Sequence, residues 1–348
     1  MVLNINLLKQ ICEIPGAPGF EKPVRELILK EVKSLADETW VDSMGNIICL
    51  KKGKSDSKPV MAAAHMDEIG FIVTHIDDKG FLRFHTLGGF DPKTLTAQRV
   101  IVHGKKDLVG VMGTKPIHVM KPEERKRMPE ISDFFIDLGM EKKEVEKQVK
   151  IGDPITRERE LVEMGPCVNC KSIDNRVSVF ILIETLRILK EIPYDFYGVF
   201  TVQEEVGLRG ASVAAHKINP AFGIGIDTTI AYDVPGAQPQ EKVTSLGAGA
   251  AIKIMDASAI CDYRMVEFLK KTADKNKIKW QPEILTAGGT DTAGLQRMGK
   301  DGAITGAISI PTRHLHQVIE MAHTEDIQSC INLLKKAVES LDDFNWDH

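Results

Sequence analysis

YGVFTVQEEVGLRG, residues 197–210, predicts a buried strand that ends in two adjacent acids, Glu204 and Glu205. Adjacent carboxylates repel each other, and each raises the pKa of its neighbour. A bound cation removes this cost, because one carboxylate can ligate the metal while the other stays free as a general base. The alternative is a solvated turn with two surface acids, since charged residues mostly lie in water.

A second strand-like run, residues 58–70, also ends in residue types that bind metals. Its apolar residues 60–64 lead to His65, and Asp67 follows two residues later. Histidine is the commonest metal ligand, and its second ring nitrogen usually needs a carboxylate or carbonyl partner. Residues i and i+2 of an extended segment point the same way, so Asp67 can be that partner. By itself, the pair is also compatible with an ordinary turn.

Two later runs end in a similar way. Residues 221–229 reach Asp227, and residues 303–317 lead to His314 and His316. The alternatives are a helix cap or an Asx-turn for the acid and surface positions for the histidines. Two histidines at alternate positions can also share one face of a strand. Both runs therefore add ligand candidates at predicted strand ends.

Asp174 stands at the start of a predicted helix. The stretch CKSIDNRV, residues 170–177, leads into residues 177–189, whose apolar side chains recur with the period of an amphipathic helix. An acid at this position is favoured as an N-cap or a first-turn acid. It can bridge two cations only if other ligands converge on the same point.

Metal-ligand candidates therefore come from five places in the chain: His65, Asp174, Glu205, Asp227 and His316. Two imidazoles and three carboxylates suit zinc or cobalt rather than calcium. All five lie at the ends of predicted elements in an alternating α/β pattern. Open α/β sheets carry their sites at the carboxyl ends of strands, so the pattern predicts one shared metal site.

These blocks resemble the M42 metallo-aminopeptidases, a family that includes glutamyl and tetrahedral aminopeptidases, some of them labelled cellulases. The resemblance covers nearly the whole chain. It rests on the following blocks in this order: PGAPGFE (15–21), HMDE (65–68), DNR (174–176), EEVG (204–207), Asp227, GGTD (288–291) and PTRHLH (311–316). His316, rather than His314, matches the family's histidine, because the family usually has a tyrosine where His314 stands.

The resemblance implies a dinuclear-metal aminopeptidase that hydrolyses the N-terminal residue from peptides. It also implies two divalent ions per subunit, most simply zinc, with cobalt as the alternative. The implied ligands are His65 and Asp227 as terminal ligands, Asp174 as the bridge, and Glu205 with His316 on the other side.

The resemblance assigns roles to four further residues. Glu204 is the general base that activates the metal-bridging water, and Asp67 orients His65. Gly289 and Asp291 are expected to help shape the substrate-binding pocket for the first side chain. The loop that carries them lacks the Gly-Lys-Ser/Thr of a phosphate-binding loop.

The implied fold is a metallopeptidase-type α/β sandwich with an inserted small β-barrel domain. The catalytic domain comprises residues 1–69 and 163–348, and the insertion comprises residues 70–162. The sequence supports the insertion, because residues 71–75 and 81–85 are strand-like and are joined by the turn signal DDKG.

The insertion has further features that the sequence predicts. Residues 99–103 and 108–113 repeat the pattern of paired short strands, which suggests a small barrel. Residues 120–128 are highly charged and predict an exposed loop, and residues 141–149 predict a short helix. In the family this domain serves subunit assembly, so a homo-oligomer is expected, either a dimer or a tetrahedral dodecamer.

Composition narrows the functional classes. A chain of 348 residues predicts two domains, and a net charge of −4 argues against a nucleic-acid surface. No apolar stretch approaches the roughly 18 residues of a membrane span, and the N-terminus lacks a signal peptide, so a cytoplasmic location and no membrane partner are expected. The six cysteines predict reduced thiols rather than a disulfide framework.

Rival functions stay open from the residues alone. A polysaccharide hydrolase needs two carboxylates around a sugar, but it leaves the two histidines unexplained and works without zinc. A two-zinc deacylase or other amide hydrolase on the same fold shares the metal chemistry and differs in whether it accepts blocked termini. A non-catalytic assembly protein predicts a broken ligand set, whereas every ligand position here is filled.

Overall fold

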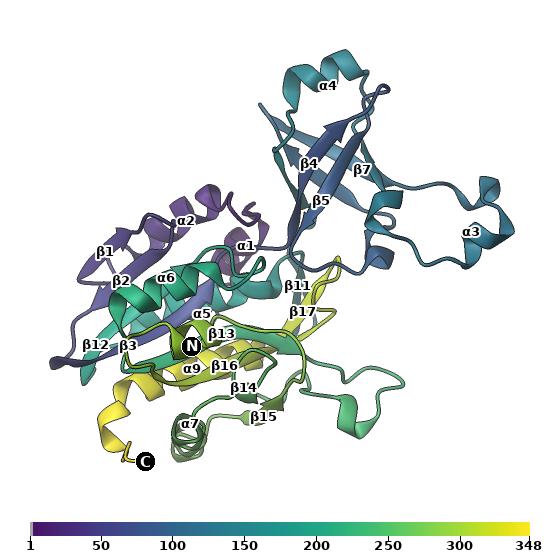
Figure 1. Cartoon of the computed structure of the whole chain (residues 1–348). Coiled ribbons are helices and arrows are strands. Elements are labelled where there is room, and N and C mark those ends of the chain that lie inside the picture. The colour runs from purple at the N-terminus through teal and green to yellow at the C-terminus, as the bar shows by residue number, and fades with distance from the viewer. Residues whose placement is uncertain (1–2) are drawn as a thin grey trace.

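The computed structural model describes residues 3–348. A large mixed sheet covered by helices forms one body, and a small closed barrel projects from it (Figure 1). The predicted α/β fold with an inserted β-barrel is therefore confirmed. No helix in the described part of the chain is long and apolar enough to cross a membrane.

Within residues 3–348, eleven strands form the large sheet, and the order along its main path is β1-β2-β12-β3-β13-β16-β17-β11-β10. Strand β14 pairs with β16, and β15 pairs with β14. The bounds are β1 Glu38–Val41, β2 Ile47–Lys51, β3 Ser55–His65, β10 Val162–Met164, β11 Cys167–Cys170, β12 Tyr194–Thr201, β13 Phe222–Ile230, β14 Ala250–Met255, β15 Trp280–Ile284, β16 Ile304–Arg313 and β17 Glu320–His323.

The centre of the sheet is parallel, because β12, β3, β13 and β16 all run in one direction. Successive side chains of β3 alternate between two hydrophobic cores, with Ala62 and Ala64 in the larger and Met61 and Ala63 in the smaller. Strands buried on both faces have continuous apolar sequences rather than alternating ones. This explains the uninterrupted apolar run that precedes His65.

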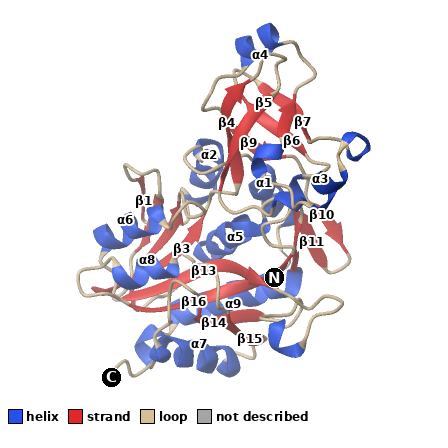
Figure 2. Ribbon diagram, turned by 45° about the vertical axis from the view of Figure 1, so that its right-hand side comes forward, coloured by secondary structure: helices blue, strands red, loops and turns tan. Residues whose placement is uncertain are grey.

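Helices cover both faces of the sheet (Figure 2). Helices α6 and α8 pack on each other and contact β12, β3, β13 and β16, whereas α5, α7 and α9 contact the sheet through the larger core. The bounds are α1 Ile5–Glu13, α2 Lys22–Val32, α3 Pro122–Lys126, α4 Lys142–Gln148, α5 Ile173–Ile188, α6 Arg209–Ile218, α7 Tyr263–Lys275, α8 Thr292–Arg297 and α9 Thr324–Glu339.

Helix α5 corrects one prediction from the sequence. The stretch that follows Asp174 was predicted to be amphipathic, but every residue from Ile173 to Leu186 is buried. The helix lies at the centre of the larger core and contacts α1, α9 and the sheet. Its polar residues, such as Arg176 and Thr185, are therefore enclosed rather than solvated.

The barrel consists of six strands in the closed order β4-β5-β8-β7-β6-β9. It has its own hydrophobic core, which includes Phe71, Val100 and Ile136. Its bounds are β4 Gly70–Ile76, β5 Leu82–Leu87, β6 Arg99–His103, β7 Asp107–Gly113, β8 Phe135–Asp137 and β9 Pro154–Arg157. The predicted hairpins, β4-β5 and β6-β7, and the predicted short helix, α4, are confirmed.

A long arm leaves the barrel between β7 and β8 and carries the short helix α3 (Figure 1). The predicted exposed segment, residues 120–128, forms part of this arm. The barrel strands lie within the predicted insertion of residues 70–162, and the division into domains at those boundaries stays a prediction.

Candidate active site

The register of the parallel strands brings the candidate residues to one edge of the sheet. His65 closes β3 and pairs with Thr201 of β12. Ala63 pairs with Gly225 of β13, so Asp227, two residues further along, is level with His65. The turn with the two acids follows β12 directly, and the loop with the two histidines follows β16. Their meeting point is the carboxyl end of the sheet, where sites of α/β proteins lie.

His65 faces three carboxylates through one ring nitrogen. Its Nε2 lies 3.3 Å from Asp174 Oδ1, 3.6 Å from Asp227 Oδ1 and 3.8 Å from Glu204 Oε2. The other ring nitrogen, Nδ1, lies 3.2 Å from the backbone carbonyl of Asp67. An imidazole that donates from Nδ1 to a carbonyl presents a free electron pair at Nε2, as metal-binding histidines do.

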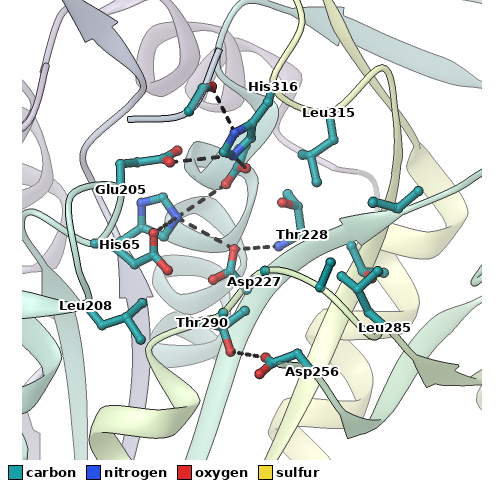
Figure 3. Close-up of a pocket in the computed structure, with 18 of the residues that line it drawn as sticks. His65, Glu205, Leu208, Asp227, Thr228, Asp256, Leu285, Thr290, Leu315 and His316 are labelled. Carbon is teal, nitrogen blue, oxygen red and sulfur yellow. Dashed lines mark hydrogen bonds and ion pairs between the residues drawn. The ribbon is translucent and has the colours of Figure 1, made fainter. Parts of the chain in front are cut away.

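His316 repeats this arrangement on the other side of Asp174, and Figure 3 shows it beside Glu205. Its Nε2 lies 3.2 Å from Asp174 Oδ2 and 3.5 Å from Glu205 Oε2, and its Nδ1 lies 3.1 Å from the carbonyl of Gly89. The two oxygens of Asp174 therefore face two different imidazoles. Possible ligand atoms therefore lie on both sides of Asp174.

Carboxylates hold the turn that carries the two acids. Asp67 accepts hydrogen bonds from the N–H groups of Glu204 and Glu205, each at 3.1 Å. Glu21 accepts a bond from the N–H of Gln203 at 3.2 Å. Three consecutive backbone donors are thus paired with two buried acids. Asp67 was predicted to orient His65, and its carboxylate does lie 3.5 Å from Nδ1, but its nearest contacts are the backbone of this turn.

The electrostatics of the metal-free centre show an excess of negative charge. Burial raises the pKa of Glu204 well above its usual value, and burial raises the pKa of Glu205 to about 8. Burial also raises the pKa of Asp227, although His65 opposes the shift. For His65 and His316, burial lowers the pKa, but the facing carboxylates outweigh it and raise both values. In the absence of metal, these groups therefore bind protons.

The donor set fits divalent cations. Groups of three ligand atoms close enough to share an ion are His65 with Asp174 and Glu205, and His65 with Glu204 and Asp227. One oxygen of Glu205 is buried without a hydrogen-bond partner. Imidazole nitrogens with carboxylate oxygens are typical zinc ligands. Cations at this position would neutralise the carboxylates, and the unpaired oxygen of Glu205 could coordinate one of them.

A cavity of about 450 Å³ opens from the centre. It runs from the metal-ligand candidates past Leu208 to Leu285 (Figure 3), and Lys253 also lines it. Gly289, a predicted substrate-binding residue, lies in its wall. Asp291, the other one, is buried behind that wall and accepts a hydrogen bond from Thr201.

The two histidines of the loop after β16 lie in different environments. They were considered for one face of a strand, but β16 ends at Arg313 and both histidines lie beyond it with positive φ angles. His316 enters the centre, whereas His314 is exposed to solvent. The structure therefore brings together all five predicted ligands and leaves His314 outside.

Four residues that contact the centre were not predicted: Glu21, Gly89, Arg157 and Glu320. Glu320 accepts a hydrogen bond from the N–H of Asp174 at 2.8 Å, and Arg157 contacts Glu320. Each is far in sequence from the residue that it supports. Glu21 belongs to the PGAPGFE block, but no local pattern distinguishes it from a surface acid.

Comparison with known proteins decides the family. Residues 45–333 match the family described as M42 glutamyl aminopeptidase. The chain belongs to this family. It is therefore a peptidase, and membership of a metallopeptidase family implies divalent metal ions.

Relatives of this M42 peptidase match it along its whole length. A putative aminopeptidase of Acetivibrio thermocellus is 41% identical over 96% of this chain and 98% of the relative. The TET aminopeptidase of Thaumarchaeota archaeon SCGC AB-539-E09 superposes with a TM-score of 0.94 at 36% identity, over 97% of this chain and 96% of that one. The TET1 peptidase of Pyrococcus horikoshii, which can assemble into a tetrahedron or an octahedral shell, has a TM-score of 0.86 at 34% identity, over 96% and 98% of the chains.

Proposed function

We propose that this M42 peptidase is an aminopeptidase that removes N-terminal residues from peptides with two divalent metal ions. The observation that carries the proposal is the position of Asp174. Its Oδ1 lies 3.3 Å from His65 Nε2, and its Oδ2 lies 3.2 Å from His316 Nε2. A carboxylate placed between two imidazoles in this way can serve two ion positions at once.

The remaining ligands divide between the two positions. Asp227 lies on the His65 side, at 3.6 Å, and Glu205 lies on the His316 side, at 3.5 Å. Zinc suits this set of nitrogen and oxygen donors, and cobalt has overlapping preferences. When bound, such ions polarise the scissile carbonyl and make water more acidic.

Glu204 is the residue that moves protons in this proposal. Its carboxylate is the most distant of the three that face His65, at 3.8 Å, and its backbone N–H is fixed by Asp67. Glu204 accepts a proton from the attacking water and then passes it to the leaving amine. Asp67 acts through the backbone of the turn, so it positions Glu204 without contacting the substrate.

The cavity wall supplies the substrate pocket in this proposal. Gly289 lies in the wall, and a Cβ there would approach the side chain of Ser258 to 2.9 Å. A larger residue would therefore push the loop into the cavity or against its neighbour. Asp291 supports the same loop from behind through Thr201 rather than through the substrate.

The arm of the barrel supports assembly into a homo-oligomer. Ile117, Val119 and Met128 are more than half exposed on this arm. Exposed apolar side chains of this size are typical of protein interfaces. The assembly of the Pyrococcus horikoshii relative into closed shells supports the same proposal. Light scattering with size-exclusion chromatography tests it, and a monomer at micromolar concentration would contradict it.

Hydrolysis of aminoacyl-anilides tests the activity. The panel contains each substrate with a free and with an acetylated amine, before and after EDTA, and after Zn²⁺ or Co²⁺ is restored. The expected result is cleavage of free-amine substrates only, lost with EDTA and recovered with metal. Cleavage of acetylated substrates would indicate a deacylase. Metal-independent cleavage of a polysaccharide, assayed in parallel, would indicate a glycoside hydrolase.

A further inference from the structure

The barrel reaches the metal-ligand candidates through the loop that follows β5. The carbonyl of Gly89 lies 3.1 Å from His316 Nδ1 and fixes which ring nitrogen carries the proton. A Cβ added at Gly88 would lie 3.4 Å from the Cβ of Glu205, and one at Gly89 would lie 3.4 Å from His316 Nδ1. The loop is therefore packed against two of the residues on the His316 side.

Arg157, the last residue of β9, makes a second contact from the barrel. Its side chain is 2% exposed, and its guanidinium donates to the carbonyl of Gln317, the residue after His316. The guanidinium also lies 6.0 Å from the ring of Phe90, which is next to Gly89. One buried cation thus contacts both the barrel loop and the histidine loop.

Glu320 continues this chain of contacts to Asp174. It is completely buried, and its Oε1 lies 3.4 Å from Arg157 Nη1. Its Oε2 accepts the hydrogen bond from the backbone N–H of Asp174 at 2.8 Å. Burial opposes the charged form of Glu320, whereas Arg157 and the bond from the N–H of Asp174 favour it, so Arg157 supports the carboxylate that holds Asp174.

The histidine loop needs such support. His316 has a φ of +57° and His314 a φ of +60°, in the left-handed region that residues other than glycine rarely adopt. The His316 side chain is also 39% exposed, in contrast to 2% for His65. The first ligand is therefore fixed by its strand, whereas the second depends on contacts from outside its own element.

We propose that Arg157 and Glu320 are positioning residues through which the barrel holds His316 and Asp174, and with them the ion on the His316 side. The proposal rests on the two-ion centre proposed above. It assigns the inserted domain a direct part in the centre, in addition to any part in assembly. Arg157 and Glu320 touch neither substrate nor ion and act only through the residues that they hold.

Isothermal titration of the chelator-stripped full-length protein with Zn²⁺ tests the proposal. The expected result for the unaltered protein is two ions per chain. Arg157→Met should keep the ion on the His65 side at nearly unchanged affinity and bind the ion on the His316 side about 10- to 100-fold more weakly, the usual effect of removing a group that orients a metal ligand. Arg157→Lys, which keeps the charge, should fall between. Glu320→Gln, which also loosens Asp174, the carboxylate that faces both sides, should weaken both ions and the one on the His316 side more.

His316→Ala identifies which ion is affected. It removes the ligand itself, so adding Arg157→Met to it should not weaken the remaining ion further, because two changes that act on one ion are not additive. Arg264→Met is the matched control. Arg264 also pairs with a carboxylate, that of Asp262, and donates to a backbone carbonyl, that of Trp346, but it lies on α7. The Arg264→Met variant should bind two ions with the affinities of the unaltered protein.

The outcomes separate this proposal from the proposed function. Two ions in the unaltered protein, with both affinities unchanged or equally weakened in Arg157→Met, would overturn the positioning role alone. Fewer than two ions in the unaltered protein would overturn both. Thermal melting shows whether each variant is folded, and if Arg157→Met is not, Glu320→Gln and Arg157→Lys decide the question by the same titration.

Discussion

At the scale of single residues, the centre depends on which side-chain atom of each residue faces its neighbours. Both histidines give Nδ1 to a backbone carbonyl and Nε2 to carboxylates. Asp174 gives one oxygen to each histidine. Asp67 accepts hydrogen bonds from the backbone of the acidic turn. The two aspartates therefore differ in role: Asp174 faces two imidazoles, whereas Asp67 holds backbone N–H groups.

We expect Glu204→Gln to keep the metal and to lose most of the turnover. Glutamine preserves the shape of the side chain but cannot accept the proton, and general acid–base catalysis typically contributes about 10²- to 10⁴-fold. The measurement is kcat on a free-amine aminoacyl-anilide, with metal content determined on the same sample. A kcat within a few-fold of the unaltered enzyme would remove Glu204 from its role.

The ligand candidates that meet at the centre could be predicted from the sequence, whereas the residues that hold them could not. His65 and Asp227 follow apolar strand runs, and the acid pair ends another. Glu320 and Arg157 show no such pattern, because their relation to Asp174 arises only when β9, β17 and α5 meet in space. Pair contacts between distant segments leave no local trace in a single sequence.

At the scale of elements, a buried ionic group joins three segments beneath the centre. Lys171 Nζ lies 2.5 Å from both carboxylate oxygens of Glu68, and Arg176 Nη2 lies 3.5 Å from one of them. Arg176 also donates to the carbonyls of Ile11 and Ile14. The group therefore joins the end of α1 and the segment after β3 to the start of α5, close in sequence to the ligand candidates His65 and Asp174.

We expect Lys171→Met to destabilise the large body by about 3 kcal/mol, because removal of one partner leaves a buried charge poorly compensated. The measurement is the urea midpoint, followed by tryptophan fluorescence. All three tryptophans, Trp40, Trp280 and Trp346, lie outside the barrel.

Lys22→Met on α2 is the control for this substitution. Lys22 pairs with Glu26, but the two side chains are 76% and 65% exposed, so the free energy of unfolding should change by less than about 1 kcal/mol. An equal effect of the two substitutions would show that the buried group contributes no more than a surface pair.

The sequence predicted the type of an element, helix or strand, more reliably than its burial. The hairpins of the barrel and the strands that carry ligands were predicted from apolar runs and turn signals. The burial of helix α5 was predicted wrongly, because polar residues such as Glu184 and Thr185 give an amphipathic pattern although they are buried. A periodic pattern shows which residues are polar and does not show whether another helix covers them.

At the scale of the whole molecule, proton uptake at the centre couples to stability. Burial raises the pKa of Glu205 from 4.5 to about 8. For His316, burial acts in the opposite direction, but Glu205 and Asp174 raise the pKa from 6.5 to about 10. In both cases the folded, metal-free protein holds more protons than the unfolded chain. Its stability therefore falls as the pH rises, and the two windows overlap between pH 6.5 and 8.

We expect the melting temperature of the EDTA-stripped protein to fall between pH 6.5 and 8. Divalent metal should reverse this trend, because ions compete with protons for the same atoms and bind more tightly as the pH rises. Differential scanning calorimetry with and without Zn²⁺ measures both effects. A melting temperature of the stripped protein that is flat or rises across this range would contradict the charge arrangement described for the centre.

The strand order also has a consequence for when the protein becomes active during its synthesis. Strand β16 lies next to β13 near the middle of the sheet, although it is among the last strands to be made. It leads to His316, which the ribosome adds after the other four ligand candidates. A nascent chain that has not reached residue 316 therefore lacks one of the five ligand candidates. The centre can therefore be completed only after β16 has been made and has paired with β13.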